Sequence, residues 1–256
     1  MVLAELKNIS KDFGGITALK EIDMVVRQGG IHGLIGPNGA GKTTLFNIIS
    51  GNYDATGGDL LFEGNSILKL RNDERVGLGI VRTFQNIRLF PSFSVLDHVK
   101  MGFHRRASAN WLSSILWLNN TKKEESWIEE ESRHLLKKMG LESFAQQQAK
   151  NLSYGNQRRL EIARALAAKP KLLLLDEPAA GLNESEVRTL LEQIREIHAE
   201  GITIILVEHD MNLVMEVSDQ ITVLSHGQKI AEGSANEIRN NPIVIREYLG
   251  TGKIEC

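Results

Sequence analysis

The chain has 256 residues, of which 42% are hydrophobic and 24% are charged. This composition is typical of a folded globular protein and excludes a wholly disordered chain. Lys and Arg number 30 against 32 Asp and Glu, so the formal net charge is −2. A general nucleic-acid binder carries a basic excess, and we therefore expect no nucleic-acid partner.

The cysteine count and the apolar runs narrow the class further. The single cysteine, Cys256, excludes an intrachain disulfide and a cysteine-based metal site. The longest apolar runs, 172–175 and 202–207, are far shorter than the roughly 20 residues of a membrane span. Glu5 and Lys7 stand where a signal peptide needs an apolar stretch. We expect a chain that stays in the compartment where it is made.

Hydrophobic patterning predicts strands that alternate with helices. The expected strands lie at 3–9, 16–26, 31–35, 60–62, 80–84, 171–175 and 202–207, with a closing hairpin of 221–224 and 228–231. The expected helices lie at 42–50, in most of 94–169, from Glu184 onward and at the end of the chain. This alternation implies an α/β core with a parallel sheet. The helical block between about 91 and 165 interrupts it and is interpreted as an inserted subdomain.

A glycine-rich segment after the third expected strand matches GxxxxGK[ST] at every fixed position and opens a helix. Glycines let backbone N–H groups turn toward phosphate oxygens, and the helix dipole favours the same anion. A lysine then neutralises the β- and γ-phosphates, and a threonine hydroxyl can bind Mg²⁺. The segment is Gly36, Pro37, Asn38, Gly39, Ala40, Gly41, Lys42 and Thr43, and Thr44 follows as a further nucleotide-binding candidate.

Two carboxylates follow the apolar strand at 172–175. Ligands of open α/β sheets bind beyond the carboxyl ends of the strands, and Mg²⁺ prefers hard oxygen ligands. We expect Asp176 to hold the metal and Glu177 to face the γ-phosphate and the attacking water. Pro178 ends the strand. Two adjacent acids suit hydrolysis, because one serves the metal and the other the water.

Residues 151–160 predict a second helix entrance with anion-binding capacity. Ser153 is a plausible N-cap, and Gly155 permits close approach of a ligand. Unpaired N–H groups at such a helix start can bind a phosphate. A capped helix without a ligand is the competing interpretation.

Taken together, these motifs make the chain resemble the nucleotide-binding subunits of ABC transporters over nearly its whole length. Leu152-Ser153-Tyr154-Gly155-Asn156 is similar to the LSGGQ signature of that family, and it lies between the phosphate loop and the acid pair as in the family. Tyr154 and Asn156 depart from the pattern. The resemblance implies two protomers arranged head to tail, with each ATP held between one phosphate loop and the Ser153 and Gly155 of the other subunit.

The resemblance also implies roles for single residues. Phe13 corresponds to the aromatic residue that stacks on adenine, although a core aromatic at a strand end is the alternative. Gln85 corresponds to the Q-loop glutamine, which contacts Mg²⁺ or the water and senses the membrane partner. His209 corresponds to the switch histidine of the γ-phosphate. Asn183 replaces the usual aspartate of the D-loop and, with Glu186, forms a capping-box-like helix start.

The implied fold is a P-loop NTPase (RecA-like) core with an N-terminal antiparallel β subdomain and an inserted α-helical subdomain. In that division 1–256 is one ABC ATPase domain. Residues 1–90 form the β subdomain and the first part of the core, 91–165 form the helical subdomain with the signature, and 166–256 form the rest of the core with the C-terminal helices.

A narrower resemblance links the segments 81–90, 179–183 and 239–250 and the pair Tyr154-Gly155 to LivG-type ATPases of bacterial and archaeal branched-chain amino acid importers. It implies Leu, Ile or Val as cargo, ATP and Mg²⁺ as cofactors, and a position at the cytoplasmic face of the membrane. The implied partners are transmembrane permease subunits, a second ATPase subunit (a copy of this chain or a LivF-like one) and, indirectly, a solute-binding protein. The alternatives are a lipopolysaccharide-export ATPase and, in another class, a P-loop nucleotide kinase. The apolar positions between Trp111 and Trp117 fit either a permease interface or subdomain core.

Overall fold

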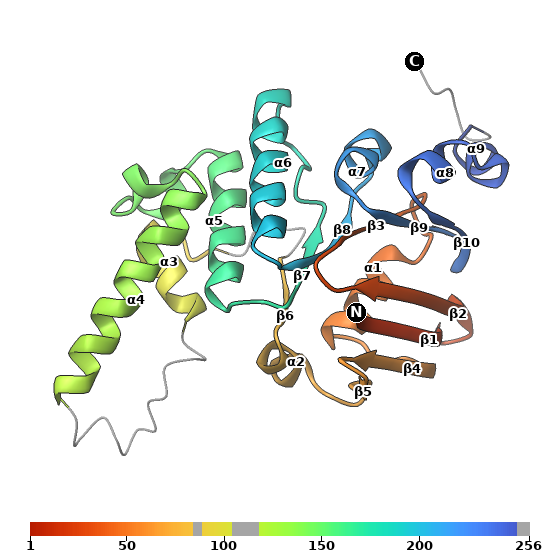
Figure 1. Cartoon of the computed structure of the whole chain (residues 1–256), viewed down its shortest axis with the longest axis horizontal. Coiled ribbons are helices and arrows are strands. Elements are labelled where there is room, and N and C mark those ends of the chain that lie inside the picture. The colour runs from red at the N-terminus through yellow and green to blue at the C-terminus, as the bar shows by residue number, and fades with distance from the viewer. Residues whose placement is uncertain (84–88, 104–117, 250–256) are drawn as a thin grey trace. The chain divides into compact units, whose positions relative to one another are not determined.

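The computed structural model describes residues 1–83, 89–103 and 118–249, and these form two compact units (Figure 1). The first unit comprises 1–82, 171–180 and the chain from 194 onward. The second comprises 83–170 and 181–193. Within the described residues, no helix combines the length and the hydrophobicity needed to cross a lipid bilayer.

The strands of the described residues build two sheets, both in the first unit. One sheet has the order β2-β1-β4-β5 and is antiparallel. Its strands are β1 (Val2–Phe13), β2 (Ile16–Arg27), β4 (Gly57–Phe62) and β5 (Asn65–Ser66). The other has the order β10-β9-β3-β8-β7-β6 and is parallel except for its β9–β10 hairpin. Its strands are β3 (Ile31–Ile35), β6 (Ile80–Arg82), β7 (Leu172–Asp176), β8 (Thr203–Val207), β9 (Gln220–Ser225) and β10 (Gln228–Gly233).

Side-chain alternation along these strands builds a core on each face of the parallel sheet. Leu34 of β3 and Leu224 of β9 join the large cluster that also includes α1 and the antiparallel sheet. Ile35 and Val223, one position away, join a smaller cluster with α7, α8 and α9. Successive residues of a strand point to opposite faces, so strands covered on both sides consist almost entirely of apolar residues.

The helices of the first unit connect these strands. They are α1 (Lys42–Ser50), α2 (Asn72–Leu78), α7 (Met211–Val217), α8 (Ala235–Arg239) and α9 (Pro242–Leu249). Helix α1 contacts strands of both sheets and ends at Gly51, whose φ of +78° closes the last turn. Helix α6 (Glu184–Ala199) begins in the second unit and ends in the first.

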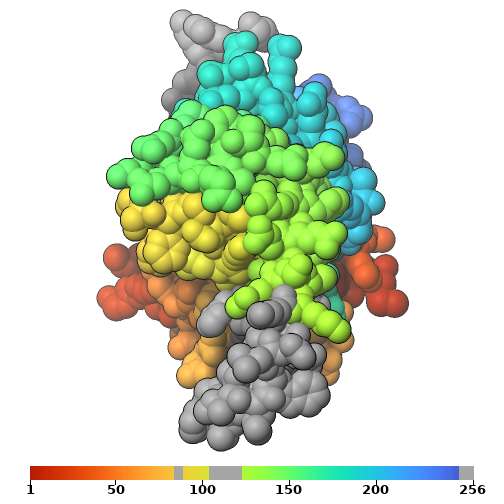
Figure 2. All heavy atoms as spheres, turned by 90° about the vertical axis from the view of Figure 1, so that its left-hand side faces the viewer, coloured from red at the N-terminus to blue at the C-terminus, as the bar shows by residue number. Residues whose placement is uncertain are grey.

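The second unit is helical. It contains α3 (Val95–Gly102), α4 (Leu118–Lys138), α5 (Tyr154–Ala167) and the short 3-10 helices Glu142–Phe144 and Ala149–Asn151. Figure 2 shows α3 in yellow beside α4 in light green. Gly102 lets α3 approach α5 closely, because a Cβ there would lie 2.3 Å from the carbonyl oxygen of Arg164.

The predicted fold class is confirmed, and so are most of the predicted elements. Strand β3 and helix α1 have the expected bounds. The expected hairpin around His226 and Gly227 forms between β9 and β10. The expected helical block from residue 94 begins with α3, which Ser94 caps by accepting a 3.0 Å hydrogen bond from the N–H of Asp97.

Candidate nucleotide-binding and catalytic site

The phosphate-loop segment lies between the carboxyl end of β3 and the start of α1. Its glycines meet two different requirements. Gly36 and Gly41 lie against neighbouring strands, since a Cβ on them would come within 2.2 Å of the Leu224 carbonyl oxygen and 2.6 Å of Leu19, respectively. Gly39, at φ +80°, has nothing within 4 Å of a built Cβ and faces open space. The loop is therefore anchored at both ends and open in the middle, as a backbone anion cradle requires.

Lys42 is the buried cation of this loop. Its Nζ donates to the carbonyl oxygens of Gly36 at 2.6 Å and Pro37 at 3.0 Å. Burial lowers the pKa of Lys42, while the negative charges of Glu177 and Asp176 act in the opposite direction. The structure therefore brings the lysine and the two carboxylates into one electrostatic site, as the sequence predicts.

Asp176 ends β7 and is nearly fully buried. Its Oδ2 accepts a 2.7 Å hydrogen bond from Arg82, whose guanidinium also donates to Asn47 of α1 at 2.6 Å. Arg82 lies at the end of β6, the strand paired with β7. The sequence pattern does not predict Arg82 as a site residue. Knowledge that the ends of two parallel strands are adjacent could have identified it. The charge pair fixes one carboxylate oxygen of Asp176.

Glu177 lies one residue beyond the strand, in left-handed backbone with φ +47°. Its amide donates to the carbonyl of Val207 at 2.9 Å, and its own carbonyl accepts from Ala180 at 3.2 Å. Most L residues avoid this conformation, so the neighbouring strand end holds it. The Glu177 carboxylate Oε1 lies 2.6 Å from Nε2 of His209. The structure thus joins the two residues expected to face the γ-phosphate and water.

Glu208 is a further buried carboxylate that sequence reasoning misses. Its oxygens accept hydrogen bonds from the amides of Ala179 at 2.6 Å and His209 at 3.3 Å. Burial raises the pKa of Glu208 to about 7, against the lowering effect of those two amides, and the charge of Glu177 adds to the rise. Glu208 therefore connects the loop after β7 to the loop after β8. A charged residue directly after a buried strand is the only sequence signal for it.

Phe13 ends β1 with its ring partly exposed. Tyr53 contacts it edge-on with ring centroids 5.5 Å apart, and the Lys11 ammonium lies 4.9 Å from the ring centroid. An exposed aromatic ring is suited to stacking on a nucleobase. The contacts leave Phe13 partly accessible rather than buried in the core, which favours the predicted adenine role over the structural alternative.

Two family models match this sequence. The ABC transporter model matches residues 19–180. The chain belongs to the ABC transporter family. A second model, described as the branched-chain amino acid ATP-binding cassette transporter, matches residues 228–254.

Curated relatives agree over almost the full length. The branched-chain amino acid transport ATP-binding protein BraF of Pseudomonas aeruginosa is 40% identical over 97% of this chain and 98% of its own. The branched-chain amino acid transport ATP-binding protein LivG of Escherichia coli K12 is 41% identical over the same shares of the two chains.

Solved structures place the fold in the same family. An ATP-binding cassette of an ABC transporter in its ADP conformation superimposes with a TM-score of 0.85, at 32% identity over 98% of this chain and 99% of that one. A dimeric cassette in a post-hydrolysis state with ADP and Pi bound has a TM-score of 0.77, at 26% identity over 91% of this chain and 99% of that one. The chain is accordingly an ABC ATPase with an ATP-binding cassette.

The predicted signature of this ABC ATPase lies at the start of α5 in the second unit. The Ser153 hydroxyl caps the helix by accepting from the N–H of Asn156 at 3.3 Å. Gly155 is buried, and a Cβ there would lie 2.5 Å from the Glu186 carboxylate. Ser153 is an exposed residue.

The donors available to Mg²⁺ are oxygens. The exposed Thr43 follows buried Lys42 at the start of α1, and Asp176 acts electrostatically on that lysine. A hydroxyl and a carboxylate are the hard ligands that Mg²⁺ prefers. These residues therefore fit the metal. Among the described residues, no group of three or more His, Cys, Asp or Glu is placed to hold a metal ion.

Gln85 lies outside the described residues, as do the apolar positions from Trp111 to Trp117. Their expected roles stay predictions.

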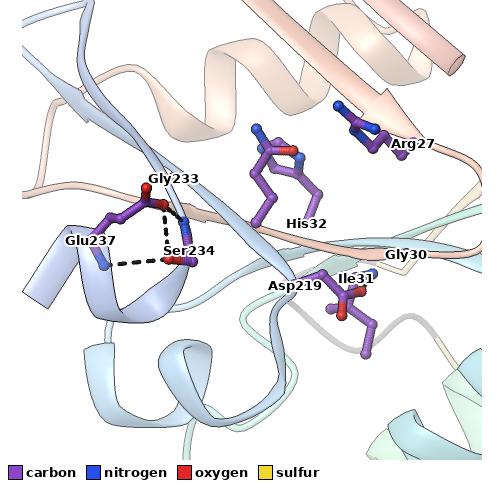
Figure 3. A pocket seen from close by; sticks show the side chains of 9 residues that line it. Arg27, Gly30, Ile31, His32, Asp219, Gly233, Ser234 and Glu237 are labelled. Carbon is purple, nitrogen blue, oxygen red and sulfur yellow. Dashed lines mark hydrogen bonds between the residues drawn. The ribbon is translucent and has the colours of Figure 1, made fainter.

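A separate hollow of about 300 Å³ lies at the other end of β3 from the phosphate loop. Figure 3 shows three sets of lining side chains, with His32 between Arg27 and the hydrogen-bonded Ser234 and Glu237. Its residues include Gly30 and Ile31, which precede or begin the strand. This hollow is therefore distinct from the nucleotide cradle.

Proposed function

We propose that this chain is the ATP-hydrolysing subunit of an importer for branched-chain amino acids. The observation that carries the proposal is the convergence of Lys42, Asp176, Glu177 and His209 at the ends of β3, β7 and β8, in a chain matched over its length by relatives named for that transport.

In the proposed mechanism the chain positions ATP and water and stabilises developing charge. Backbone N–H groups of the phosphate loop and the Lys42 ammonium hold the β- and γ-phosphates. Glu177 accepts a proton from the attacking water, and His209, held 2.6 Å from Glu177, orients the γ-phosphate. Mg²⁺ held by Thr43, Asp176 and Gln85 would supply further neutralisation of phosphate charge. Phe13 stacks on the adenine.

The site is completed by a second ATPase subunit. Exposed Ser153 and the amides at the start of α5 would contact the γ-phosphate of the ATP bound to that subunit. A related cassette with ADP and Pi bound is dimeric, which supports the association of two subunits. The second subunit is either a copy of this chain or a LivF-like relative, and the pair would work on permease subunits at the cytoplasmic face of the membrane, supplied by a solute-binding protein.

The cargo assignment has support that is independent of the ATP site. Residues 228–254, which include β10, α8 and α9, match the branched-chain family model. No observation on this chain favours lipopolysaccharide export or a nucleotide kinase.

The test is purification from native membranes followed by reconstitution. We expect permease subunits and a second ATPase to copurify, and proteoliposomes with the solute-binding protein to take up labelled leucine when ATP is present on the ATPase side. The matched control carries Lys42→Ala, which should assemble without uptake. Uptake of another solute with no competition by leucine, isoleucine or valine would refute the cargo, and absence of ATP hydrolysis would refute the function.

A further inference from the structure

Tyr154 is a large aromatic residue at a position where the family signature has glycine. It is the first residue of α5, and its residue surface is 45% exposed. Arg158, one turn later, donates to its phenol oxygen at 3.2 Å and lies 5.5 Å from its ring centroid. The ring is therefore held along the first turn of the helix and does not swing freely in solvent.

The same ring contacts the segment that leads into α6. A Cβ built on Gly181 would lie 3.1 Å from Cε1 and 3.6 Å from Cζ of Tyr154. Gly181 also has φ +78°, which side-chain-bearing residues rarely adopt. Glycine at this position therefore allows both the backbone turn and the close approach of the aromatic ring.

A second contact joins the two helix starts. A Cβ on Gly155 would lie 2.5 Å from Oε1 of Glu186. Glu186 accepts from the amide of Asn183 at 3.1 Å, and Asn183 in turn caps α6 by accepting from the amide of Glu186 at 3.0 Å. Figure 1 shows α5 and α6 side by side, and these contacts place their first turns together. The signature and the Gly181–Asn183 segment thus pack as one surface.

We infer that Tyr154 is a positioning residue that fixes the Gly181–Asn183 segment against the signature. The two segments then meet a second subunit and its ATP as one rigid element, and the ordering is complete before the subunits associate. This inference rests on the proposed ATP sandwich for its functional consequence, but the packing of Tyr154 on Gly181 can be tested in the isolated subunit.

The first experiment is hydrogen exchange on the full chain without nucleotide. In Tyr154→Ala, amides of residues 181–186 should exchange roughly tenfold faster. Loss of the ring's packing on Gly181 makes local opening of this segment easier, and we expect the equilibrium constant for opening to rise by about that factor. Tyr154→Phe, which keeps the ring and loses the bond from Arg158, should restore most of the protection. Unchanged exchange in Tyr154→Ala would overturn the inference whatever the chain's function.

The second experiment measures ATP-driven dimer formation in a Glu177→Gln background. Tyr154→Ala should bind ATP as a monomer with a dissociation constant within about twofold of the parent, since the phosphate loop is untouched, while the midpoint protein concentration for dimerisation rises roughly tenfold. Tyr154→Phe should dimerise nearly as the parent does. Equal midpoints for the alanine and parent proteins would contradict the positioning role.

A double-mutant cycle separates the ring contact from backbone strain. Gly181→Ala adds strain at φ +78° in any background, but its Cβ meets the ring only when Tyr154 is present. The two changes should therefore be non-additive in exchange and in dimerisation. Gly64→Ala is the matched control, because Gly64 has φ +81° and nothing near its Cβ. If the effects of Gly181→Ala and Tyr154→Ala add as simply as those of Gly64→Ala and Tyr154→Ala, the inference is wrong.

Failure of the parent Glu177→Gln protein to dimerise would count against a sandwich of two copies, and the second experiment would then use the copurified partner ATPase. The hydrogen-exchange experiment and the double-mutant cycle measured by exchange use the isolated subunit and do not depend on dimerisation. A failure of the inference can therefore be distinguished from a failure of the proposed function.

Discussion

Two neighbouring carboxylates of this ATPase have different surroundings and therefore different capacities. Asp176 is the last residue of β7 and accepts a hydrogen bond from the guanidinium of Arg82. Glu177 has left the strand in left-handed backbone, and its carboxylate contacts His209. A carboxylate held by a permanent cation is suited to a fixed ligand role, whereas one paired with an imidazole can accept and pass on a proton.

Glu177→Gln should therefore bind ATP with unchanged affinity and hydrolyse it roughly 10²–10⁴ times more slowly, the usual loss for a missing general base. Phosphate release measured at saturating ATP checks this. Glu184→Gln, which neutralises an exposed acid at the start of α6, is the control and should retain activity. Full turnover by Glu177→Gln would remove Glu177 from the mechanism.

His32 illustrates how burial of one residue makes stability depend on pH. It lines the hollow in Figure 3, and one of its ring nitrogens, Nε2, lies 2.8 Å from the Thr222 hydroxyl. Burial lowers its pKa from 6.5 to about 4, with the charge of Lys229 as a smaller cause. The folded protein thus keeps His32 neutral at pH values where the unfolded chain protonates it.

The contribution of His32 to stability is complete above pH 6.5 and is lost as the pH falls from 6.5 toward 4, at about 1.4 kcal/mol per pH unit and up to about 3 kcal/mol in total. His32→Gln should flatten the dependence of the unfolding free energy on pH in this window. Urea titrations at several pH values measure it. Exposed His134→Gln should leave the slope unchanged, and an unaltered slope in His32→Gln would disprove the assignment.

At the scale of elements, α1 depends on a residue from another helix. The side chain of Arg75 in α2 is buried and donates to the carbonyls of Ile48 and Ile49 at the end of α1, at 3.0 Å to Ile49. It also donates to the carbonyls of Leu70 and Leu68, each at 2.9 Å. The last carbonyls of a helix lack the N–H partners of a following turn. Arg75 supplies hydrogen-bond donors to two of these carbonyls.

Arg75→Met should lower the free energy of unfolding by about 2–4 kcal/mol, because it removes the guanidinium donors from the carbonyls of Ile49, Leu68 and Leu70. Arg71→Met removes an exposed arginine at the N-cap of the same helix and should cost far less. Denaturant unfolding of both variants provides the comparison. Equal small losses would mean that water replaces the guanidinium at the end of α1.

Hydrophobic patterning predicts best those helices and strands that are buried along most of their length. Strands β3, β7 and β8 are apolar runs, and the bounds of α1 follow from its helical spacing and the glycines at its ends. Helix α2 escapes prediction because its buried residue is Arg75. The start of β4 escapes it because Gly57 and Gly58 carry no strand signal.

Prediction of the site follows the same division. The phosphate loop and the pair Asp176–Glu177 are each contiguous in sequence, so their spacing is enough to predict them. Arg82 and Glu208 act through residues on neighbouring strands, and no local pattern reports such a contact. Only the strand order, which brings separate strand ends together, could reveal them.

At the scale of the whole molecule, hydrolysis is proposed to need two subunits. Glu177→Gln incubated with ATP should therefore have twice the 28.5 kDa mass of one chain in light scattering, because the nucleotide is retained between the subunits. Adding Lys42→Ala should return it to a monomer by weakening ATP binding. A monomer at high protein and ATP concentrations would instead point to an obligatory different partner.

The strand order also has a consequence for where this ATPase can be cut. The ABC transporter match ends at residue 180, yet β8, formed by Thr203–Val207, lies between β3 and β7 in the sheet. An excised 19–180 fragment would retain both flanking strands around a slot roughly 10 Å wide. Each rim of that slot would present unpaired backbone groups to other chains. The catalytic unit that can fold is thus longer than the segment matched by the ABC transporter model, and we expect the shortened version to aggregate.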